Sequence, residues 1–433
     1  MYYNISGNKI MISIFKIKNF KSIDNLELKT LFQEGKLPNN YRNLPNHVAF
    51  FNKKEKLTPV LSIYGANASG KSNIIESMYR FIEIIQTGVE NTYFPNKLLN
   101  PTEDTEFEIT FIYKKKEYNY KIIYNKNNIN YEHLLCDNLE LFLCKNQNIE
   151  NIVSNSDFYN KKLIKEIYTV ECLNEKLQQT TTLLQKLGKQ YTNLNVDITS
   201  AYIYLTQHIE VCLSNRPCSI SSGIKYLANI LGNESEALNK ILKLIRQFDI
   251  DIEKIEIESD KLPFKDYVKN FNDFEITYID EKSQIVEYNK IFSIHKNLNN
   301  EHIKFNFNNE ESTGTNILGS IIGMALVVLI KGGILFVDEL DRSIHPLILS
   351  QLIQLFKDKR YNKTNSQLIF TSHCTDILEN EFLRMSEIAI VNKTKKNGTT
   401  IKKLSEINGI RNVLNFRKHY LMGEYSGIPF PYL

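Results

Sequence analysis

The chain has 433 residues, of which 42% are hydrophobic and 24% are charged, and its formal net charge at pH 7 is +4. This balance is typical of a globular protein with sizeable cores. Aromatic residues make up 11% of the chain, which argues against low-complexity disorder. The small basic excess argues against a protein that wraps nucleic acid over its whole surface, and leaves open a local basic patch that binds it.

The N-terminal residues, the apolar runs and the cysteines together predict a cytoplasmic protein. Residues 1–9 lack the apolar region of a signal peptide. The longest mainly apolar run, 317–330, is shorter than the roughly 20 residues that span a membrane, so it predicts a buried helix. No CxxC pair and no cluster with zinc spacing occurs among the six cysteines, Cys136, Cys144, Cys172, Cys212, Cys218 and Cys374. We therefore expect reduced thiols in a soluble, cytoplasmic protein with no membrane partner.

The N-terminal part is expected to begin with strands and to continue as strand, loop and helix. Apolar and polar residues alternate over 12–20 and again over 23–28, which predicts two strands. Residues 30–57 are mostly polar and predict a loop. The apolar run 59–64 predicts a buried strand, and apolar residues at helical spacing predict a helix over 73–85 after a glycine-containing turn.

The middle of the chain changes its pattern twice. Alternation over 106–125, broken by a turn at 114–117, and a third run over 129–134 predict an antiparallel sheet. From about 150 to 255 the apolar spacing becomes helical, without the sustained heptads of a long coiled coil. Residues 251–309 return to short alternating strands.

The C-terminal part alternates strands with helices, which is typical of an α/β fold. A helix over 313–329 is expected to lead into a strand over 332–338. A further helix and two strands, 367–370 and 388–391, are expected to follow.

The strongest motif is a glycine-containing loop, 65–72, which fits the P-loop pattern GxxxxGK[ST] at every fixed position and lies between a predicted strand and a predicted helix. Backbone N–H groups of such a loop point at phosphate oxygens. Lys71 is expected to reach the β- and γ-phosphates, and the Ser72 hydroxyl to bind magnesium. The residues expected to hold ATP are Gly65, Asn67, Ala68, Ser69, Gly70, Lys71, Ser72 and Asn73.

Two carboxylates, Asp338 and Glu339, end the predicted strand 332–338. In a P-loop fold the first would hold magnesium, directly or through water. The second is placed to polarise an attacking water as a general base. Alone the pair is a weak signal, because acidic residues are common at helix N-termini, but together with the P-loop it becomes a strong one.

Further segments complete a family resemblance. Glu311-Ser-Thr-Gly-Thr315 precedes the helix before Asp338, and Thr371-Ser-His373 follows the next strand, although a single histidine at a strand end is more often structural. With these motifs the chain resembles the ABC-type ATPases of the SMC/RecF clan, in particular compact ATPases of bacterial phage-defence and abortive-infection loci. The matching segments are the opening strand 14–22, the P-loop ending 70–73, a shortened signature motif 311–315, a Walker B motif with D-loop 338–346, an H-loop 371–373 and the ending 425–429.

The resemblance implies a homodimer of two heads that sandwich ATP. Ser312 and Gly314 of one copy would then donate to the γ-phosphate held by the other copy. His373 would sense that phosphate, Glu339 would activate water, and Asp341 would act across the interface. Two departures are visible: no glutamine after the first helix fits a Q-loop, since Gln86 comes too early, and the signature is incomplete. Hydrolysis is therefore expected to be slow or stimulated by a partner.

The motifs predict one α/β head split in sequence: an ABC-type P-loop ATPase fold, with a mixed sheet, helices and an antiparallel β subdomain. Residues 1–150 would form the lobe with the P-loop, and 301–433 the lobe with the signature, Walker B motif, D-loop and H-loop. Residues 151–300 would form a mainly helical insertion that returns to strands. Only 60 residues follow His373, too few for a Toprim nuclease domain, so a nuclease or toxin effector is expected to be a separate protein.

Three functions stay open at this stage. The favoured one is an ATP-hydrolysing switch that controls an effector in phage defence. The alternatives are a RecF-like DNA-binding or repair ATPase and a non-catalytic ATP-sensing scaffold. Lysines at 161–189 make the helical part locally basic, but interleaved glutamates favour a solvated helix face over a nucleic-acid contact, which stays an alternative.

Overall fold

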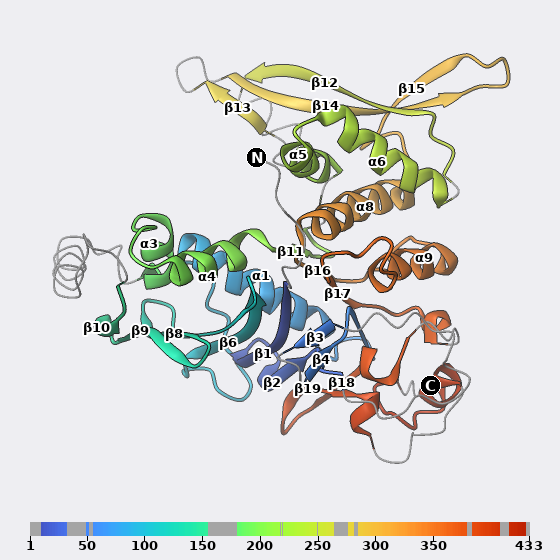
Figure 1. The fold of residues 1–433 in the computed structure, drawn as a ribbon. Helices are drawn as coiled ribbons and strands as arrows, with labels where there is room; N and C mark the ends of the chain where they lie inside the picture. Colours follow the sequence, from blue (N-terminus) through green and yellow to red (C-terminus); the bar gives the residue numbers. More distant parts are fainter. Residues whose placement is uncertain are drawn as a thin grey trace. The chain divides into compact units, whose positions relative to one another are not determined.

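The structure is a computed structural model that describes residues 10–32, 49–51, 55–154, 180–216, 218, 220–248, 250–263, 276–280, 285–378, 383–407 and 415–429. It divides into two compact units, each made of separate chain segments (Figure 1). The first unit comprises Met1–Ser214, Val328–Leu340 and Ile353–Leu433, and the second comprises Asn215–Val327 and Asp341–Leu352. The division into residues 1–150, 151–300 and 301–433 stays a prediction.

The first unit is built on one 13-stranded sheet of mixed direction. Its antiparallel side runs in the order β10 (Asn148–Ile152), β9 (Leu139–Lys145), β8 (Ile129–Cys136), β7 (Lys116–Tyr124), β6 (Thr105–Tyr113), β1 (Met11–Phe20) and β2 (Ile23–Lys29). The sheet continues through β19 (Gly398–Lys403), β18 (Ile388–Thr394), β5 (Val60–Gly65), β17 (Gln367–Thr371), β16 (Ile334–Val337) and β11 (Ile209–Cys212). The last five of these strands, from β18 to β11, are parallel to one another.

The two sides of this sheet follow from different sequence patterns. All residues of β5, β16 and β17 are buried, as expected for parallel strands covered on both faces. In β6 and β7 buried and half-buried residues alternate, as expected for antiparallel strands with one face on the core. The predicted strands of both sides and the predicted hairpin turn at 114–117 are therefore confirmed, and the fold is α/β.

Helix α1 (Lys71–Thr87) confirms the helix predicted after the P-loop. Its Phe81 ring lies 5.6 Å from the Phe15 ring of β1 and 5.8 Å from the Phe107 ring of β6, centroid to centroid. This aromatic cluster lies in the main core of the unit and anchors α1 to the sheet. Further helices are α3 (Leu183–Lys189), α4 (Val196–Gln207) and α10 (Phe416–Leu421).

Several elements of the first unit were not expected. The polar stretch 30–57 contains the short strands β3 (Ala49–Phe51) and β4 (Glu55–Leu57), so the loop prediction is wrong there. Strands β9 and β10 extend the antiparallel sheet beyond the predicted third strand. Short strands of this kind depend on pairing with a neighbour, which the sequence pattern alone does not reveal. The apolar positions predicted as helical between 155 and 179 lie outside the described residues.

Strand β11 interrupts the region predicted to be helical and is the outermost parallel strand. The buried His208 precedes it, and its Nδ1 lies 2.7 Å from the carbonyl oxygen of Gly332, just before β16. Burial lowers the pKa of His208 to about 4, so the imidazole is neutral at pH 7 and its Nδ1–H donates to that carbonyl. This contact joins the starts of β11 and β16, and at the other end of the pair the Asp338 N–H donates to the Cys212 carbonyl oxygen at 2.9 Å.

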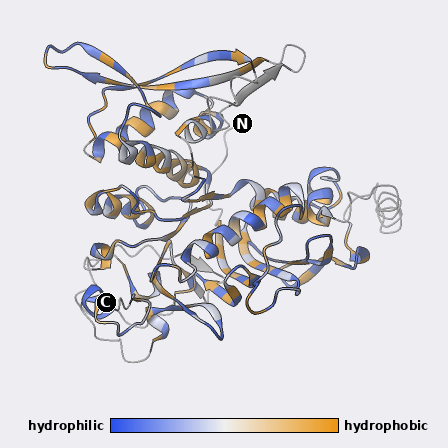
Figure 2. Ribbon diagram, turned by 180° about the vertical axis from the view of Figure 1, so that it is seen from behind, coloured by the Kyte–Doolittle hydropathy of each residue, from blue (hydrophilic) through white to orange (hydrophobic). Residues whose placement is uncertain are grey.

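The second unit combines helices with a four-stranded sheet. Its elements are α5 (Ile220–Leu231), α6 (Glu234–Gln247), β12 (Lys254–Pro263), β13 (Ile276–Asp280), β14 (Ile285–Lys296), β15 (His302–Asn306) and the N-terminal part of α8 (Thr313–Lys331). Hydrophobic and hydrophilic residues mix along its helices, as expected for helices with one buried face (Figure 2). Helices α5 and α8 meet backbone to backbone, because a Cβ on Gly223 would lie 2.8 Å from the Gly323 Cα.

Helix α8 confirms the helix predicted over 313–329, whereas two cysteines correct an expectation. With 19 residues, α8 is longer than the apolar run suggested and passes a length and composition test for a membrane span; 56% of its most apolar window is buried. One such helix is weak evidence for a membrane span, because the core helix of a soluble protein passes the same test. Cys136, Cys144 and Cys374 are not in disulfide bonds, but Cys212 and Cys218 are disulfide-bonded. The prediction of reduced thiols is wrong for these two, since spacing alone does not distinguish an oxidised cysteine from a thiol.

Candidate nucleotide site

A cavity of about 570 Å³ lies at the carboxyl ends of the parallel strands of the first unit. The P-loop follows β5, Glu339 follows β16, His373 follows β17 and Lys393 lies near the end of β18. Adjacent parallel strands bring their carboxyl ends to one edge of a sheet, where ligands bind in open α/β folds. The lining comprises Asn67, Ala68, Ser69, Gly70, Lys71, Ser72, Asn73, Glu339, His373 and Lys393.

Neighbouring atoms lie so close to the P-loop glycines that a side chain at these positions would collide with them. A Cβ on Gly65 would lie 2.5 Å from the carbonyl oxygen of Val391, on the neighbouring strand β18. Gly70, directly before α1, has a φ of 104°, and a Cβ there would collide with the Thr399 hydroxyl. Ala68 also adopts a left-handed conformation, with a φ of 60°. The loop therefore curls tightly, as a phosphate-binding loop must.

The polar atoms of the P-loop fit an anion. The buried Lys71 directs its Nζ inward, where it donates to the carbonyl oxygens of Gly65 at 2.9 Å and Ala66 at 3.1 Å. The Ser69 Oγ is buried and has no hydrogen-bond partner among the described residues. A buried polar atom without a partner is costly, so this hydroxyl is suited to an incoming phosphate oxygen. The residues present therefore fit a nucleoside triphosphate.

A chain of polar side chains braces the P-loop from outside the motif. The Asn73 Nδ2 donates to the Ser22 Oγ at 2.6 Å, and the Ser22 and Thr399 hydroxyl oxygens are 2.7 Å apart. The Thr399 Oγ1 in turn donates to the Ser69 carbonyl oxygen at 2.9 Å. This chain joins α1, the β1–β2 turn and β19. No sequence motif predicts the role of Thr399, since no local signal marks a residue that far from the loop in sequence.

Asp338 is held by two hydroxyl groups. Its Oδ1 accepts a hydrogen bond from the Thr371 Oγ1 at 2.7 Å, and its Oδ2 accepts one from the Ser214 Oγ at 2.8 Å. The side chain is buried and is not part of the cavity lining, whereas the predicted metal ligand Ser72 is exposed in it. No group of three or more metal-binding side chains occurs among the described residues. Ser72 is therefore the predicted ligand that fits direct contact with magnesium, and Asp338 would act through water, because magnesium in proteins usually keeps several waters.

Glu339 combines a half-buried position in the cavity lining with a strained backbone. Its φ is 54°, in the left-handed region that few residues other than glycine adopt. The Glu339 N–H donates to the Thr371 Oγ1 at 2.7 Å, so the hydroxyl that orients Asp338 also orients the next residue. Strained conformations of this kind are concentrated at functional sites. Thr371 and Ser214 were not singled out from the sequence for these roles.

The signature and D-loop residues lie in the second unit. The Ser312 Oγ accepts a hydrogen bond from the Thr315 N–H at 3.1 Å and so caps α8. A Cβ on Gly314 would lie 2.6 Å from the Ser343 carbonyl oxygen, so the glycine allows the signature to pack against the segment that follows Asp341. Glu311 accepts hydrogen bonds from Ser293 and lies 2.6 Å from the His295 Nε2. The described lining of the P-loop cavity includes none of Ser312, Gly314 and Asp341.

No glutamine occurs in the described lining of this cavity. Gln86 lies near the C-terminus of α1, where its Nε2 donates to the carbonyl oxygen of Thr206 at 3.3 Å.

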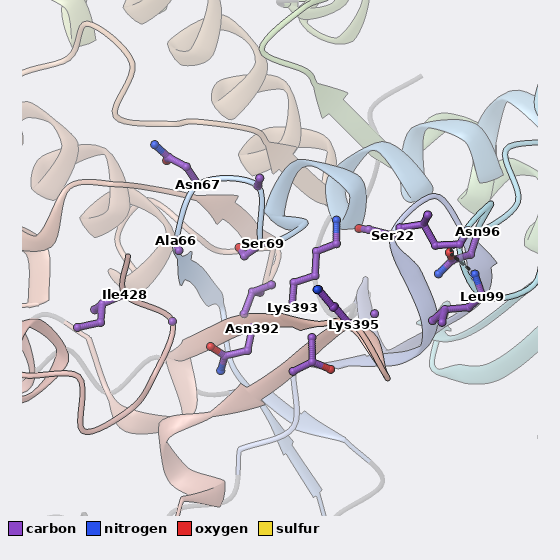
Figure 3. Close-up of a pocket in the computed structure, with 16 residues that line it drawn as sticks. Ser22, Ala66, Asn67, Ser69, Asn96, Leu99, Asn392, Lys393, Lys395 and Ile428 are labelled. Carbon is purple, nitrogen blue, oxygen red and sulfur yellow. Dashed lines mark hydrogen bonds between the residues drawn. The ribbon is translucent and has the colours of Figure 1, made fainter. Parts of the chain in front are cut away.

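A second cavity of about 410 Å³ adjoins the first (Figure 3). The two share Asn67, Ala68, Ser69 and Lys393. The remaining lining mixes apolar side chains with amides and includes Leu98, Leu99, Ile428, Asn96 and Asn392. Apolar walls with a few polar groups are typical of small-molecule sites, so this space suits the base and ribose of a nucleotide.

Comparison with known protein families agrees with this geometry. A family model described as "AAA domain, putative AbiEii toxin, Type IV TA system" matches residues 60–157 and 218–379, more than half of the chain. The chain belongs to this family. The match confirms the resemblance to ATPases of abortive-infection loci, and with the mixed sheet and the P-loop cavity it identifies an ABC-type P-loop ATPase fold.

The solved structures that match this AAA family member share little sequence identity with it. The SMC head domain from Thermotoga maritima is 14% identical, with 90% of this chain and 98% of that chain covered and a TM-score of 0.38. An SMC head bound to the C-terminal winged-helix domain of ScpA is 12% identical, with coverages of 92% and 99% and a TM-score of 0.38. The recombination mediator RecF with ATP is 14% identical, with coverages of 84% and 94% and a TM-score of 0.35. No curated protein matches the chain.

Proposed function

We propose that this protein binds ATP with magnesium in the P-loop cavity and hydrolyses it. One observation carries the proposal: strand ends far apart in sequence bring the P-loop, Glu339 and His373 to one cavity. A phosphate-binding loop, a carboxylate and a histidine in one cavity are the groups that water attack on a γ-phosphate requires.

Each residue has a distinct task in this mechanism. The Lys71 ammonium exchanges its bonds to the loop carbonyls for the β- and γ-phosphates, and the Ser69 hydroxyl donates to a phosphate oxygen. The Glu339 carboxylate accepts a proton from the attacking water, and His373 contacts the γ-phosphate. Ser72 and Asp338 would hold magnesium, which neutralises charge between the β- and γ-phosphates when bound.

We further propose that two copies assemble head to head around ATP. The support is the resemblance of residues 311–315 to a signature motif. A second copy would supply Ser312 and Gly314, and Asp341 would act across the interface. This assembly would control a separate effector, a nuclease or toxin, in anti-phage defence in the cytoplasm. The naming of a toxin and a TA system in the family description supports that role.

The ATP site is tested by replacing Lys71 with alanine. We expect ATP to bind about tenfold to a hundredfold more weakly, because a hydrogen bond to a charged group contributes roughly 1.5–3 kcal/mol. Equilibrium titration with a fluorescent ATP analogue measures the change, and thermal unfolding checks that the variant is folded. Lys126→Ala, at an exposed turn position, is the control. Wild-type affinity in a folded Lys71→Ala variant would refute the site.

The dimer is tested at Ser312 with asparagine, which preserves helix capping because asparagine is an equally good N-cap. We expect Ser312→Asn to bind ATP as the wild type does, but to lose ATP-dependent dimerisation and at least about tenfold of its turnover, since the longer amide moves the donor away from the position of the serine hydroxyl and so disrupts a charge-assisted hydrogen bond. Light scattering after size-exclusion chromatography, with and without ATP, measures the dimer. A variant that still dimerises and turns over ATP normally would exclude the signature assignment.

A further inference from the structure

Lys393 is the one residue outside the P-loop that lines both cavities of the site. Within the described lining of the P-loop cavity, the lysines are Lys71 and Lys393. In Figure 3 the Lys393 side chain extends from its strand toward the P-loop and Ser22. The neighbouring Lys395 lines only the second cavity, so Lys393 is the lysine of this strand that lies where the two cavities meet.

Backbone pairing fixes the position from which Lys393 extends. Strand β18 runs parallel to β5 with Val391 opposite Gly65, so Lys393 lies just beyond the point where the P-loop begins. The β18–β19 hairpin is secured by the Thr399 N–H, which donates to the Ser22 carbonyl oxygen at 2.8 Å. Gly398, with a φ of 61°, allows this approach, because a Cβ there would lie 2.5 Å from the same oxygen. The strand is therefore held in place beside the phosphate site.

The backbone of Lys393 is held in place, but its ammonium group is available to bind a ligand. It makes no hydrogen bond or ion pair with the residues that the structure describes, and the side chain is exposed. The P-loop lysine serves the β- and γ-phosphates, and the second cavity suits the base and ribose. The part of a nucleotide that crosses the junction between them is the α-phosphate, which carries negative charge.

We infer that Lys393 is a binding residue for the α-phosphate of the bound nucleotide. The inference rests on the proposed function, and it makes the β18–β19 hairpin a second source of positive charge besides the P-loop. Because ATP and ADP share the α-phosphate, the contact strengthens the binding of both by the same factor. It thus raises nucleotide affinity without discriminating between substrate and product.

The test compares Lys393→Gln with Lys396→Gln, which removes an exposed lysine of the same hairpin that lines neither cavity. Dissociation constants for ATP and for ADP are measured by titration on the full chain. We expect Lys393→Gln to weaken both by roughly three- to tenfold, in keeping with a charge-assisted contact in a partly solvated site. Lys396→Gln is expected to leave both unchanged, and Lys393→Arg to retain the wild-type values.

The outcomes separate this inference from the proposed function. If the wild type binds neither nucleotide, the proposed function fails. If the wild type binds both and Lys393→Gln binds them equally well, the inference alone is overturned. A loss for ATP without a loss for ADP overturns the α-phosphate assignment, because it would place Lys393 at the γ-phosphate. An equal loss in Lys396→Gln overturns it as well, since only the general charge of the hairpin would then matter.

Discussion

Replacement of Glu339 by glutamine is expected to lower ATP turnover by about 10²–10⁴-fold, the usual contribution of a positioned general base. ATP affinity is expected to stay within about twofold of the wild type, because glutamine keeps the size and removes only the proton-accepting charge. Phosphate release measures the turnover, and titration with a fluorescent ATP analogue measures the affinity.

The local structure makes glutamine a clean replacement. Glu339 has a φ of 54°, and its N–H is bonded to the Thr371 Oγ1. Neither feature depends on the carboxylate, so the strained turn after β16 should survive in the variant. Glu90→Gln, at an exposed position after α1, is the matched control and should turn over ATP normally.

Three results would change the proposal. Unaltered turnover in Glu339→Gln would show that another group activates the water. Undiminished phage defence in a variant that binds ATP without hydrolysing it would favour the ATP-sensing scaffold. Tight binding to DNA ends, with a steep loss of affinity at higher salt, would favour the RecF-like alternative.

Replacement of Lys357 by methionine is expected to lower the free energy of unfolding by about 3–5 kcal/mol, the usual cost of breaking a buried ion pair on one side. The Lys357 Nζ lies 2.5 Å from the Glu387 Oε2, and the two side chains are 0% and 2% exposed. Methionine fills the space but leaves the Glu387 carboxylate buried without its counter-charge. Urea denaturation followed by circular dichroism measures the change.

The position of this ion pair links stability to the nucleotide site. Glu387 ends the 3₁₀ turn Met385–Glu387, directly before β18, the strand that carries Lys393. The double variant Lys357→Met, Glu387→Leu should recover much of the loss, because an apolar pair can replace a buried ion pair. Lys359→Met, at an exposed position, should be nearly neutral. A Lys357→Met variant as stable as the wild type would contradict the ion-pair argument.

Local patterns accounted for most of the elements that carry the site. The apolar run before Gly65, the loop itself and the helical spacing after it predict β5, the P-loop and α1 without any tertiary information. The Asp338–Glu339 pair could be predicted because a fully buried strand precedes it. In each case neighbouring residues specify both the element and the chemistry, so short-range sequence suffices.

Other members of the site depend on contacts between distant segments. Ser214 and Thr371 donate hydrogen bonds to Asp338, and Thr399 donates one to the Ser69 carbonyl oxygen of the P-loop. Ser214 and Thr399 lie outside the sequence motifs, and the H-loop motif that contains Thr371 does not predict this contact. Strand β11, which brings Ser214 into place, lies in a stretch with helical spacing and exists through its pairing with β16. A four-residue strand carries too little local preference to be recognised alone.

The sequence by itself determined a P-loop ATPase with a general-base candidate, because those signals are contiguous. Only the tertiary structure decided which strand ends share the cavity, which hydroxyls orient Asp338, and that Lys393 stands where the two cavities meet. The physical reason is that strand order and register arise from hydrogen bonds between segments far apart in the chain. Length and composition restricted the possible classes of protein, and the order of the strands determined which residues share the nucleotide cavity.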